Sequence, residues 1–268
     1  MLALKLVLVP AFLAALTVAG RVWGPSVAGW LAGLPVVAGP IVLLLALERG
    51  PSFAAQASAA SIAAIAASEA FNFAYAWTCR RVTWPLALIV GMAGWVGVAI
   101  VLTQLPAGLA WAVAAACVAV AVSQSGLPRV TGHVPAARFG LGDLAVRMLA
   151  GALLTVAVTT LSASMGATCS GLLSVFPLLG IVLAVSAQRA HGADFVALLM
   201  RGMVIGRASF AAFFAVTATM LPQYGVWISF ACASVVSVIV QGATKRMIGA
   251  ARPVQAVSRE LAEQQSVE

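Results

Sequence analysis

Charged residues are scarce in this chain. Only 7 of its 268 residues are Asp or Glu and 15 are Lys or Arg, so 8% of the sequence is charged, whereas 63% is apolar. Soluble proteins have about 25% charged and 45–50% apolar residues. The interior of a soluble domain of this size cannot accommodate so many apolar side chains. The composition therefore excludes a soluble protein and predicts an all-α polytopic membrane protein that lies in a lipid bilayer.

Residues that usually bind metals or carry out catalysis are also few. The chain has 2 histidines and 4 cysteines, and none of them has the C-x-x-C or Cys/His spacing of a metal or redox site. No paired carboxylates and no nucleophile and base at suitable spacing indicate an enzyme. Basic residues of membrane proteins gather in cytoplasmic loops, so the net charge of +8 does not indicate nucleic-acid binding. We therefore expect a protein that is not an enzyme, with no metal, cofactor or nucleic-acid partner.

About nine apolar runs are long enough to cross a membrane as helices, for which about 20 residues are needed. They follow one another closely, and no long soluble segment separates them. The polar residues from Lys245 onward predict a cytoplasmic tail. The runs are residues 2–20, 27–47, 53–78, 84–104, 107–124, 143–163, 167–188, 194–220 and 223–243.

The positions of the basic residues predict the orientation of these helices. With the N-terminus outside, the charged residues of the outer loops are only Glu48 and Arg49. We therefore expect the N-terminus outside and the C-terminus in the cytoplasm. The abundance of Ala, Gly, Val and Arg suits a bacterium with a GC-rich genome, which predicts the bacterial cytoplasmic (inner) membrane. The inner segments then hold most of the basic residues, as cytoplasmic loops do: Arg21, Arg80, Arg81, Arg129, Arg138, Arg189, Lys245, Arg246 and Arg252.

The sequence contains an internal duplication. Residues 1–76 align without a gap on residues 143–218, at an offset of about 142. Because five predicted helices precede the second copy, the two copies enter the membrane from opposite sides, as the inverted repeats of secondary transporters do. Matches of glycine, proline and phenylalanine carry the alignment: Gly24 with Gly166, Gly29 with Gly171, Pro35 with Pro177, Gly50 with Gly192, Phe53 with Phe195, and Phe71 with Phe213.

The duplication divides the chain into two inverted-topology repeats of five and four helices. The first repeat covers residues 1–125, and a cytoplasmic connector follows at residues 126–142. The second repeat covers residues 143–244, and residues 245–268 form the polar tail.

Two predicted helices have interruptions at equivalent positions. Gly29, Gly33 and Pro35 lie in the run at 27–47, and Gly171 and Pro177 lie at matching places in the second copy. Proline removes a backbone donor, so each helix should kink or break, and the freed carbonyl groups can point at a substrate or ion. Matching interrupted helices are typical of transporter sites. The alternative is that these small residues only allow close packing of helices.

Polar residues also lie on one face of the run at 53–78, next to the acidic Glu69. An ionisable side chain at this depth needs a partner or water. Arg207 aligns with Ile65 of the first copy, which is one helical turn from Glu69, so Glu69 and Arg207 could meet near the middle of the membrane. We expect them to belong to a substrate or ion pathway, although a static ion pair that fixes helix packing is the alternative. The neighbouring polar residues of the pathway are Ser61, Ser68 and Asn72.

One stretch of the first copy resembles the signature of GlpM-type small membrane proteins, which have a few helices. The resemblance covers about 25 residues, and in the second copy Ala190 and His191 replace two of them. It implies a fused duplication of a small ancestor and no particular substrate. The inverted arrangement is also similar to the 5+5 plan of the drug/metabolite transporter superfamily, but with nine helices and an outside N-terminus. The GlpM-like residues are Ala28-Gly29, Leu34-Pro35 and Leu47-Glu48-Arg49-Gly50.

Two hypotheses for the function follow. The first is a small inverted-repeat secondary transporter, a permease or exporter, that moves a small molecule or ion by alternating access. The second is a non-transporting integral membrane subunit of an envelope or polysaccharide assembly system, which the lack of an extramembrane domain favours. A homodimer is compatible with either hypothesis.

Overall fold

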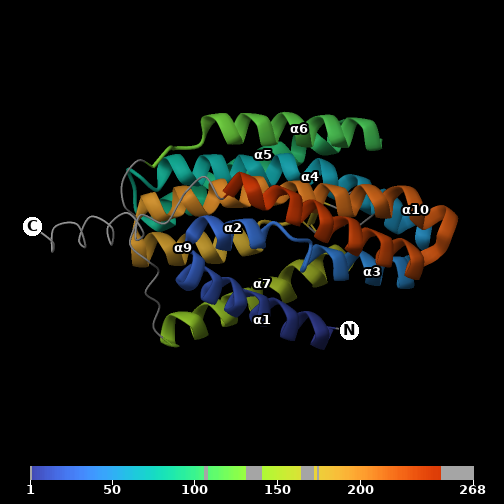
Figure 1. Cartoon of the computed structure of the whole chain (residues 1–268), viewed down its shortest axis with the longest axis horizontal. Coiled ribbons are helices and arrows are strands. Elements are labelled where there is room, and N and C mark those ends of the chain that lie inside the picture. The colour runs from blue at the N-terminus through green and yellow to red at the C-terminus, as the bar shows by residue number, and fades with distance from the viewer. Residues whose placement is uncertain (1, 106–107, 131–140, 164–171, 174, 249–268) are drawn as a thin grey trace, which may run out of the picture.

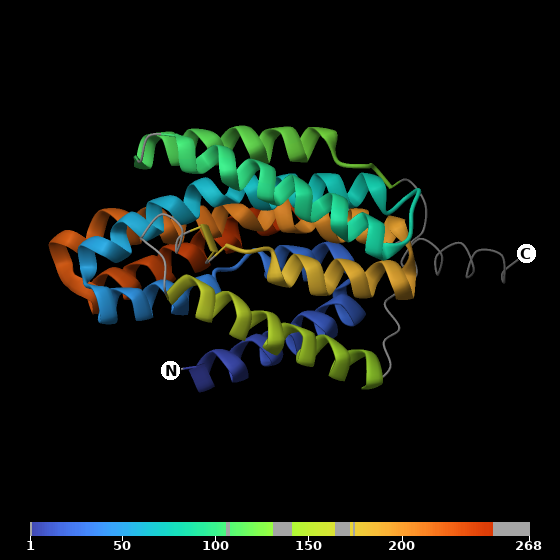
Figure 2. The ribbon, with the colours of Figure 1, turned by 180° about the vertical axis from the view of Figure 1, so that it is seen from behind.

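The computed structural model describes residues 2–105, 108–130, 141–163, 172–173 and 175–248. These residues form helices and connecting segments without any strand, which confirms the predicted all-α fold. Most helices run along the long axis of one bundle, and α1 and α7 cross each other at its edge (Figures 1 and 2). The helices are α1 (Leu2–Trp23), α2 (Pro25–Ala32), α3 (Ala38–Arg49), α4 (Pro51–Thr78), α5 (Trp84–Gln104), α6 (Leu109–Gly126), α7 (Leu141–Ala163), α9 (Leu178–His191) and α10 (Ala193–Ile248).

Both predicted interruptions coincide with helix ends. The run at 27–47 forms two helices, α2 and α3, and Pro35 lies in the segment between them. In the second copy, α9 begins at Leu178, directly after Pro177, which takes the N-cap position. Proline explains both the break between α2 and α3 and the start of α9, because it cannot donate a backbone hydrogen bond and its ring clashes with the preceding turn. Gly171 lies outside the described residues.

Helix α10 is a hairpin of two antiparallel limbs. Gly225 has φ 72° and ψ −179°, a backbone conformation outside the helical region, and Pro222 lies just before it. Ser209 and Gln241 are each 16 residues from Gly225, and Ser209 Oγ is 2.5 Å from Gln241 Oε1. The two limbs lie side by side in orange and red in Figure 1. They match the predicted runs at 194–220 and 223–243, although the helix continues past the predicted start of the tail, as far as Ile248.

Helix α4 and the first limb of α10, which the sequence alignment places in equivalent positions, pack against each other in opposite directions. Side-chain contacts join Ser58 to Thr217 at 3.0 Å, Glu69 to Arg207 at 2.9 Å, and Arg80 to Asp194 at 3.2 Å. As the residue number rises along α4, it therefore falls along the first limb of α10. The two helices are antiparallel neighbours.

The equivalent helices α1 and α7 are also antiparallel. Arg147 Nη1 donates to Thr17 Oγ1 at 3.3 Å, and the Cα of Gly151, one turn further along α7, faces Leu13, one turn earlier in α1. Helix α7 crosses α1 where the Gly151 backbone leaves room for the Leu13 side chain (Figure 2).

Two glycines of the duplication have the same unusual backbone conformation. Gly50 joins α3 to α4 with φ 91° and ψ 163°, and its equivalent Gly192 joins α9 to α10 with φ 83° and ψ −176°. A side chain would be strained at this positive φ, whereas glycine is not. The sequence match at these positions therefore reflects the same sharp turn between two helices in each copy.

Five helix ends meet at one end of the bundle. Arg80, just after α4, contacts Asp194 at the start of α10. Trp77 Nε1 in the last turn of α4 donates to the carbonyl of Gly126, the last residue of α6, at 3.0 Å. The guanidinium of Arg189, near the end of α9, lies 6.0 Å from the ring centroid of Trp84, the first residue of α5.

Within the described residues, three stretches are long and apolar enough to cross a membrane. They are α5, α6 and residues Ala193–Lys245 of α10. Helices α2, α3 and α9 are shorter because the chain is interrupted beside them, and α4 contains polar residues, among them Gln56, Glu69 and Asn72, that lower its hydropathy. The outward faces of α5 and α6 expose large apolar side chains, which include Ile89, Ile100, Trp111, Val118 and Val122.

Candidate functional site

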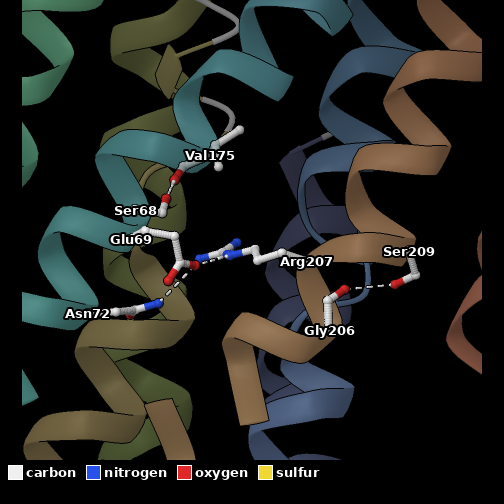
Figure 3. A network of polar contacts seen from close by, with 7 residues as sticks. All are labelled: Ser68, Glu69, Asn72, Val175, Gly206, Arg207 and Ser209. Atoms are coloured by element: carbon white, nitrogen blue, oxygen red, sulfur yellow. Dashed lines mark hydrogen bonds and ion pairs between the residues drawn. The ribbon is translucent and has the colours of Figure 1, made fainter. Parts of the chain in front are cut away.

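The predicted partners Glu69 and Arg207 form a buried ion pair. Arg207 Nε of α10 donates to Glu69 Oε1 of α4 at 2.9 Å (Figure 3). The Glu69 side chain is 1% exposed and that of Arg207 is 12% exposed. Each charge is costly to bury alone, so each requires the other at this depth.

The ion pair leaves polar groups of both side chains unused. Asn72 Nδ2 also donates to Glu69 Oε1, at 3.3 Å, whereas the buried Oε2 has no hydrogen-bond partner among the described residues. Within the described part of the chain, Arg207 donates a hydrogen bond only through Nε, and its guanidinium lies 5.8 Å from the ring centroid of Phe210. The terminal nitrogens of Arg207 thus keep donors for another group.

A small cavity lies beside Arg207, between the two interrupted segments. Its volume is about 50 Å³, room for roughly three to five water molecules. Both α3 and α9 begin at this cavity, so the positive ends of their dipoles lie at its wall. The lining residues are Ala32, Leu34, Val37, Ala38, Val175, Phe176, Pro177, Leu178, Leu179, Gly180, Met203, Arg207 and Phe210.

The polar face of α4 contacts the second interruption. Ser68 Oγ donates to the carbonyl oxygen of Val175 at 3.0 Å (Figure 3). Val175 lies two residues before Pro177, so Ser68 binds a carbonyl group close to the start of α9. Ser61 is buried two turns earlier in α4 and donates to the carbonyl of Ala57 at 2.8 Å.

The two glycines of α2 permit close packing with α10. A Cβ atom added to Gly29 would lie 2.0 Å from the carbonyl oxygen of Leu199, and one added to Gly33 would lie 2.5 Å from the Cα atom of Gly206. Neither glycine lines the cavity, so their contacts fit the packing alternative. Pro35 lies between the cavity-lining residues of the interrupted segment, and its carbonyl accepts a hydrogen bond from Gly39 N at 2.8 Å.

Two glutamines that sequence reasoning missed join helices across the structure. Tyr75 Oη donates to Gln188 Oε1 at 2.7 Å, and Gln188 Nε2 donates to the carbonyls of Cys79 and Val82 at 3.2 and 2.9 Å. Gln188 therefore binds α9 to the end of α4.

Gln241, in the second limb of α10, joins that limb to α2, just before the first interruption. Its Nε2 donates to the carbonyl of Trp30 at 2.9 Å, and Trp30 Nε1 donates to Thr244 Oγ1 at 3.0 Å. The Trp30 carbonyl belongs to the last turn of α2 and also accepts a hydrogen bond from Gly33 N at 3.1 Å. An amide side chain inside an otherwise apolar run was the signal that could have identified both glutamines.

The site has no metal ligands within the described part of the chain. No group of three or more His, Cys, Asp or Glu side chains gathers there, and Cys79, Cys117 and Cys232 are free thiols. Comparison with protein-family models, with curated proteins and with solved structures gives no match to this chain. The similarity of residues 28–50 to GlpM-type proteins therefore stays a resemblance of local sequence.

Proposed function

We propose that the protein is a secondary transporter of a small solute or ion in a bacterial cytoplasmic membrane, with about nine spans in two inverted repeats. Three stretches have the length and hydropathy of spans, and the outward faces of α5 and α6 are apolar. Of the remaining helices, α2, α3, α4 and α9 lie along the same axis of the bundle, whereas α1 and α7 cross each other at its edge (Figure 1). In this arrangement α2 and α3 cross the bilayer together as a pair of short helices, with the irregular backbone between them kept inside the protein.

The packing of equivalent helices supports the inverted repeats. Helix α1 is antiparallel to α7, and α4 is antiparallel to the first limb of α10. Each pair consists of the same segment from the two copies. An antiparallel contact between equivalent helices is the arrangement that a two-fold axis in the membrane plane would produce.

The distribution of charge supports a cytoplasmic location for one end of the bundle. The end where α4, α6 and α9 terminate carries Arg80, Arg81, Arg129 and Arg189. Basic residues concentrate on the cytoplasmic side of membrane proteins. This orientation puts the N-terminus outside and the C-terminus inside.

One observation carries the proposed transport function: both interrupted segments border the same cavity, and the buried cation Arg207 lines it. Interrupted helices that meet at a charged site in the interior of the bundle are the architecture of a transporter binding site. A static ion pair would not require the two chain interruptions to lie beside it. The proposed pathway therefore centres on Glu69 and Arg207.

The test is an unbiased uptake measurement. Proteoliposomes that contain the purified protein are incubated in a bacterial metabolite extract, and the solutes inside them are identified by mass spectrometry. We expect the wild-type protein to enrich at least one small solute relative to empty liposomes. Glu69→Gln should abolish this enrichment because it removes the charge that opposes Arg207.

Asp194→Asn is the matched control. It also replaces a carboxylate by an amide in an ion pair, but Asp194 is 57% exposed and far along α10 from the cavity. It should transport like the wild type. Lumen contents equal to those of empty liposomes, for a folded wild-type protein, would contradict the transporter and favour a non-transporting subunit, which should then co-purify with a stable partner.

A further inference from the structure

We infer that the cavity beside Arg207 binds a small monovalent anion, and that Glu69 takes up a proton when the anion binds. This inference rests on the transporter function proposed above and names the substrate class and the coupled ion. It concerns the same ion pair and cavity.

Arg207 has donors to spare for an anion. A guanidinium has five N–H groups, and Arg207 uses one of them, on Nε, for Glu69. Arg207 also lines the cavity. Planar N–H groups of arginine bind carboxylates and similar oxyanions through paired hydrogen bonds.

The electrostatics of the wall favour an anion over a cation. Among the described residues that line the cavity, Arg207 is the only charged one. The N-termini of α3 and α9 add partial positive charge, because Ala38 and Leu178, their first residues, both face the cavity. None of the described lining residues is a carboxylate that could attract a cation.

The size of the cavity limits the anion. Room for roughly three to five water molecules corresponds to an anion of about three or four non-hydrogen atoms. Formate, nitrate, bicarbonate and acetate have this size. A sugar acid or a nucleotide does not fit without enlargement of the cavity.

Charge balance links the anion to a proton. Glu69 and Arg207 neutralise each other, so a bound anion leaves one negative charge in excess in a buried place, which is costly. Protonation of the Glu69 carboxylate to the neutral acid removes this excess. Its Oε2 atom is buried and has no hydrogen-bond partner in the described part of the protein, so it is available for the proton.

Among the described residues, Arg207 is the only ionisable group that forms an ion pair with Glu69. Helix α4 packs against α3, α5, α6 and α10 and also contacts α9, whose ionisable residues Arg189 and His191 lie in its last turn, near the end of α4. Helix α5 has no charged residue, the only ionisable group of α6 is the exposed Cys117, and the charges of α3 are Glu48 and Arg49 in its last turn. On α10, Arg207 is the charged residue that reaches Glu69.

The experiment measures nitrate binding and proton uptake together. Sodium nitrate is added to the purified full-length protein in weakly buffered detergent solution with a pH indicator, and binding is followed by calorimetry. We expect one proton to be taken up for each nitrate bound, and the Kd for nitrate to rise about tenfold per pH unit wherever Glu69 is ionised in the free protein. Sodium gluconate, which is too large, and tetramethylammonium chloride are the control salts.

Variants separate the two parts of the inference. Glu69→Gln mimics the protonated acid, so it should bind nitrate with a Kd that does not change with pH and without proton uptake. Arg207→Gln should weaken nitrate binding at least about tenfold because the charged donors are lost. Absence of nitrate and formate binding, or binding without proton uptake by the wild type, overturns the inference, and neither result depends on the folding of a variant.

The uptake measurement described above distinguishes this inference from the transporter itself. Enrichment of only cations or neutral solutes overturns the anion site and leaves the transporter. Nitrate binding with proton uptake, but no solute enrichment in proteoliposomes, supports the anion site and contradicts transport.

Discussion

Replacement of Gly29 by alanine tests the packing that holds the first interruption in place. The added Cβ atom would lie 2.0 Å from the carbonyl oxygen of Leu199 and 3.0 Å from Met203 N, both backbone atoms of α10. Real Cβ atoms essentially never lie within 3.0 Å of another heavy atom in this way. Helix α2 must therefore move away from α10 by at least about 1 Å, because main-chain atoms of a packed helix cannot rotate aside.

The size of the effect follows from the contacts that this movement would break. Overpacking costs about 1–3 kcal/mol. The hydrogen bonds from Gln241 to the Trp30 carbonyl and from Trp30 to Thr244, at 2.9 and 3.0 Å, would lengthen beyond hydrogen-bond range, and each contributes about 1 kcal/mol. The better helix propensity of alanine offsets up to about 1 kcal/mol. We expect a net loss of about 2–4 kcal/mol in the free energy of unfolding.

The assay is thermal unfolding of the detergent-purified protein, followed by tryptophan fluorescence. The expected loss lowers the Tm by about 4–16 °C, at about 2–4 °C per kcal/mol. Gly242→Ala is the control, because it lies in α10 and a Cβ atom added there has no contact within 4 Å. It should leave the Tm unchanged or raise it. A Gly29→Ala protein that unfolds at or above the wild-type temperature would refute the close packing of α2 on α10.

Three further predictions concern buried polar groups. Glu69→Ala leaves the charge of Arg207 uncompensated and should lower the free energy of unfolding by about 3–5 kcal/mol. The double variant with Arg207→Leu should regain most of this loss. If denaturant unfolding shows that the losses of the two single variants add, the pairing is contradicted. Gln188→Leu removes three hydrogen bonds at the end of α4, so trypsin should cleave after Arg80 faster than in the wild type, and an unchanged cleavage rate would show that this contact does not hold the helix end. Burial, together with the nearby Asp194, raises the pKa of the Cys79 thiol to about 11 despite the opposing charge of Arg80. In a protein whose other cysteines are alanine, alkylation of Cys79 at pH 8 should therefore be at least tenfold slower than after unfolding in SDS and should accelerate as the pH rises towards 11, because only the thiolate reacts.

The sequence predicts the helices well because apolar runs and proline positions are local signals. The run at 84–104 coincides with α5, and the interruption at Pro35 separates α2 from α3 as expected. The turn at Gly225 falls close to the predicted gap between residues 220 and 223. A glycine or proline changes the backbone by its own conformational limits, so its effect does not depend on the rest of the fold.

The contacts between helices are less predictable from the sequence. Glu69 and Arg207 could be paired because Arg207 aligns with a residue one turn from Glu69, and equivalent helices meet near the axis that relates them. The partners of Gln188 and Gln241 depend on the rotation and depth of packing of several helices, which no local pattern specifies. For Gly29, the sequence leaves two roles open, and the distance to Leu199 favours packing.

The ion pair also marks a position where the two copies have diverged. At the offset of 142, Glu69 aligns with Ala211 and Arg207 with Ile65, so both equivalent positions hold apolar residues. A fold that needed an ion pair only to fix the helices could have kept it in both copies or in neither. Instead, the two charged residues occur only once, beside a cavity that is lined by one interrupted segment from each proposed copy. In the proposed transporter, the two interrupted segments supply the cavity, and the ion pair supplies the chemistry that the transport and nitrate-binding experiments address.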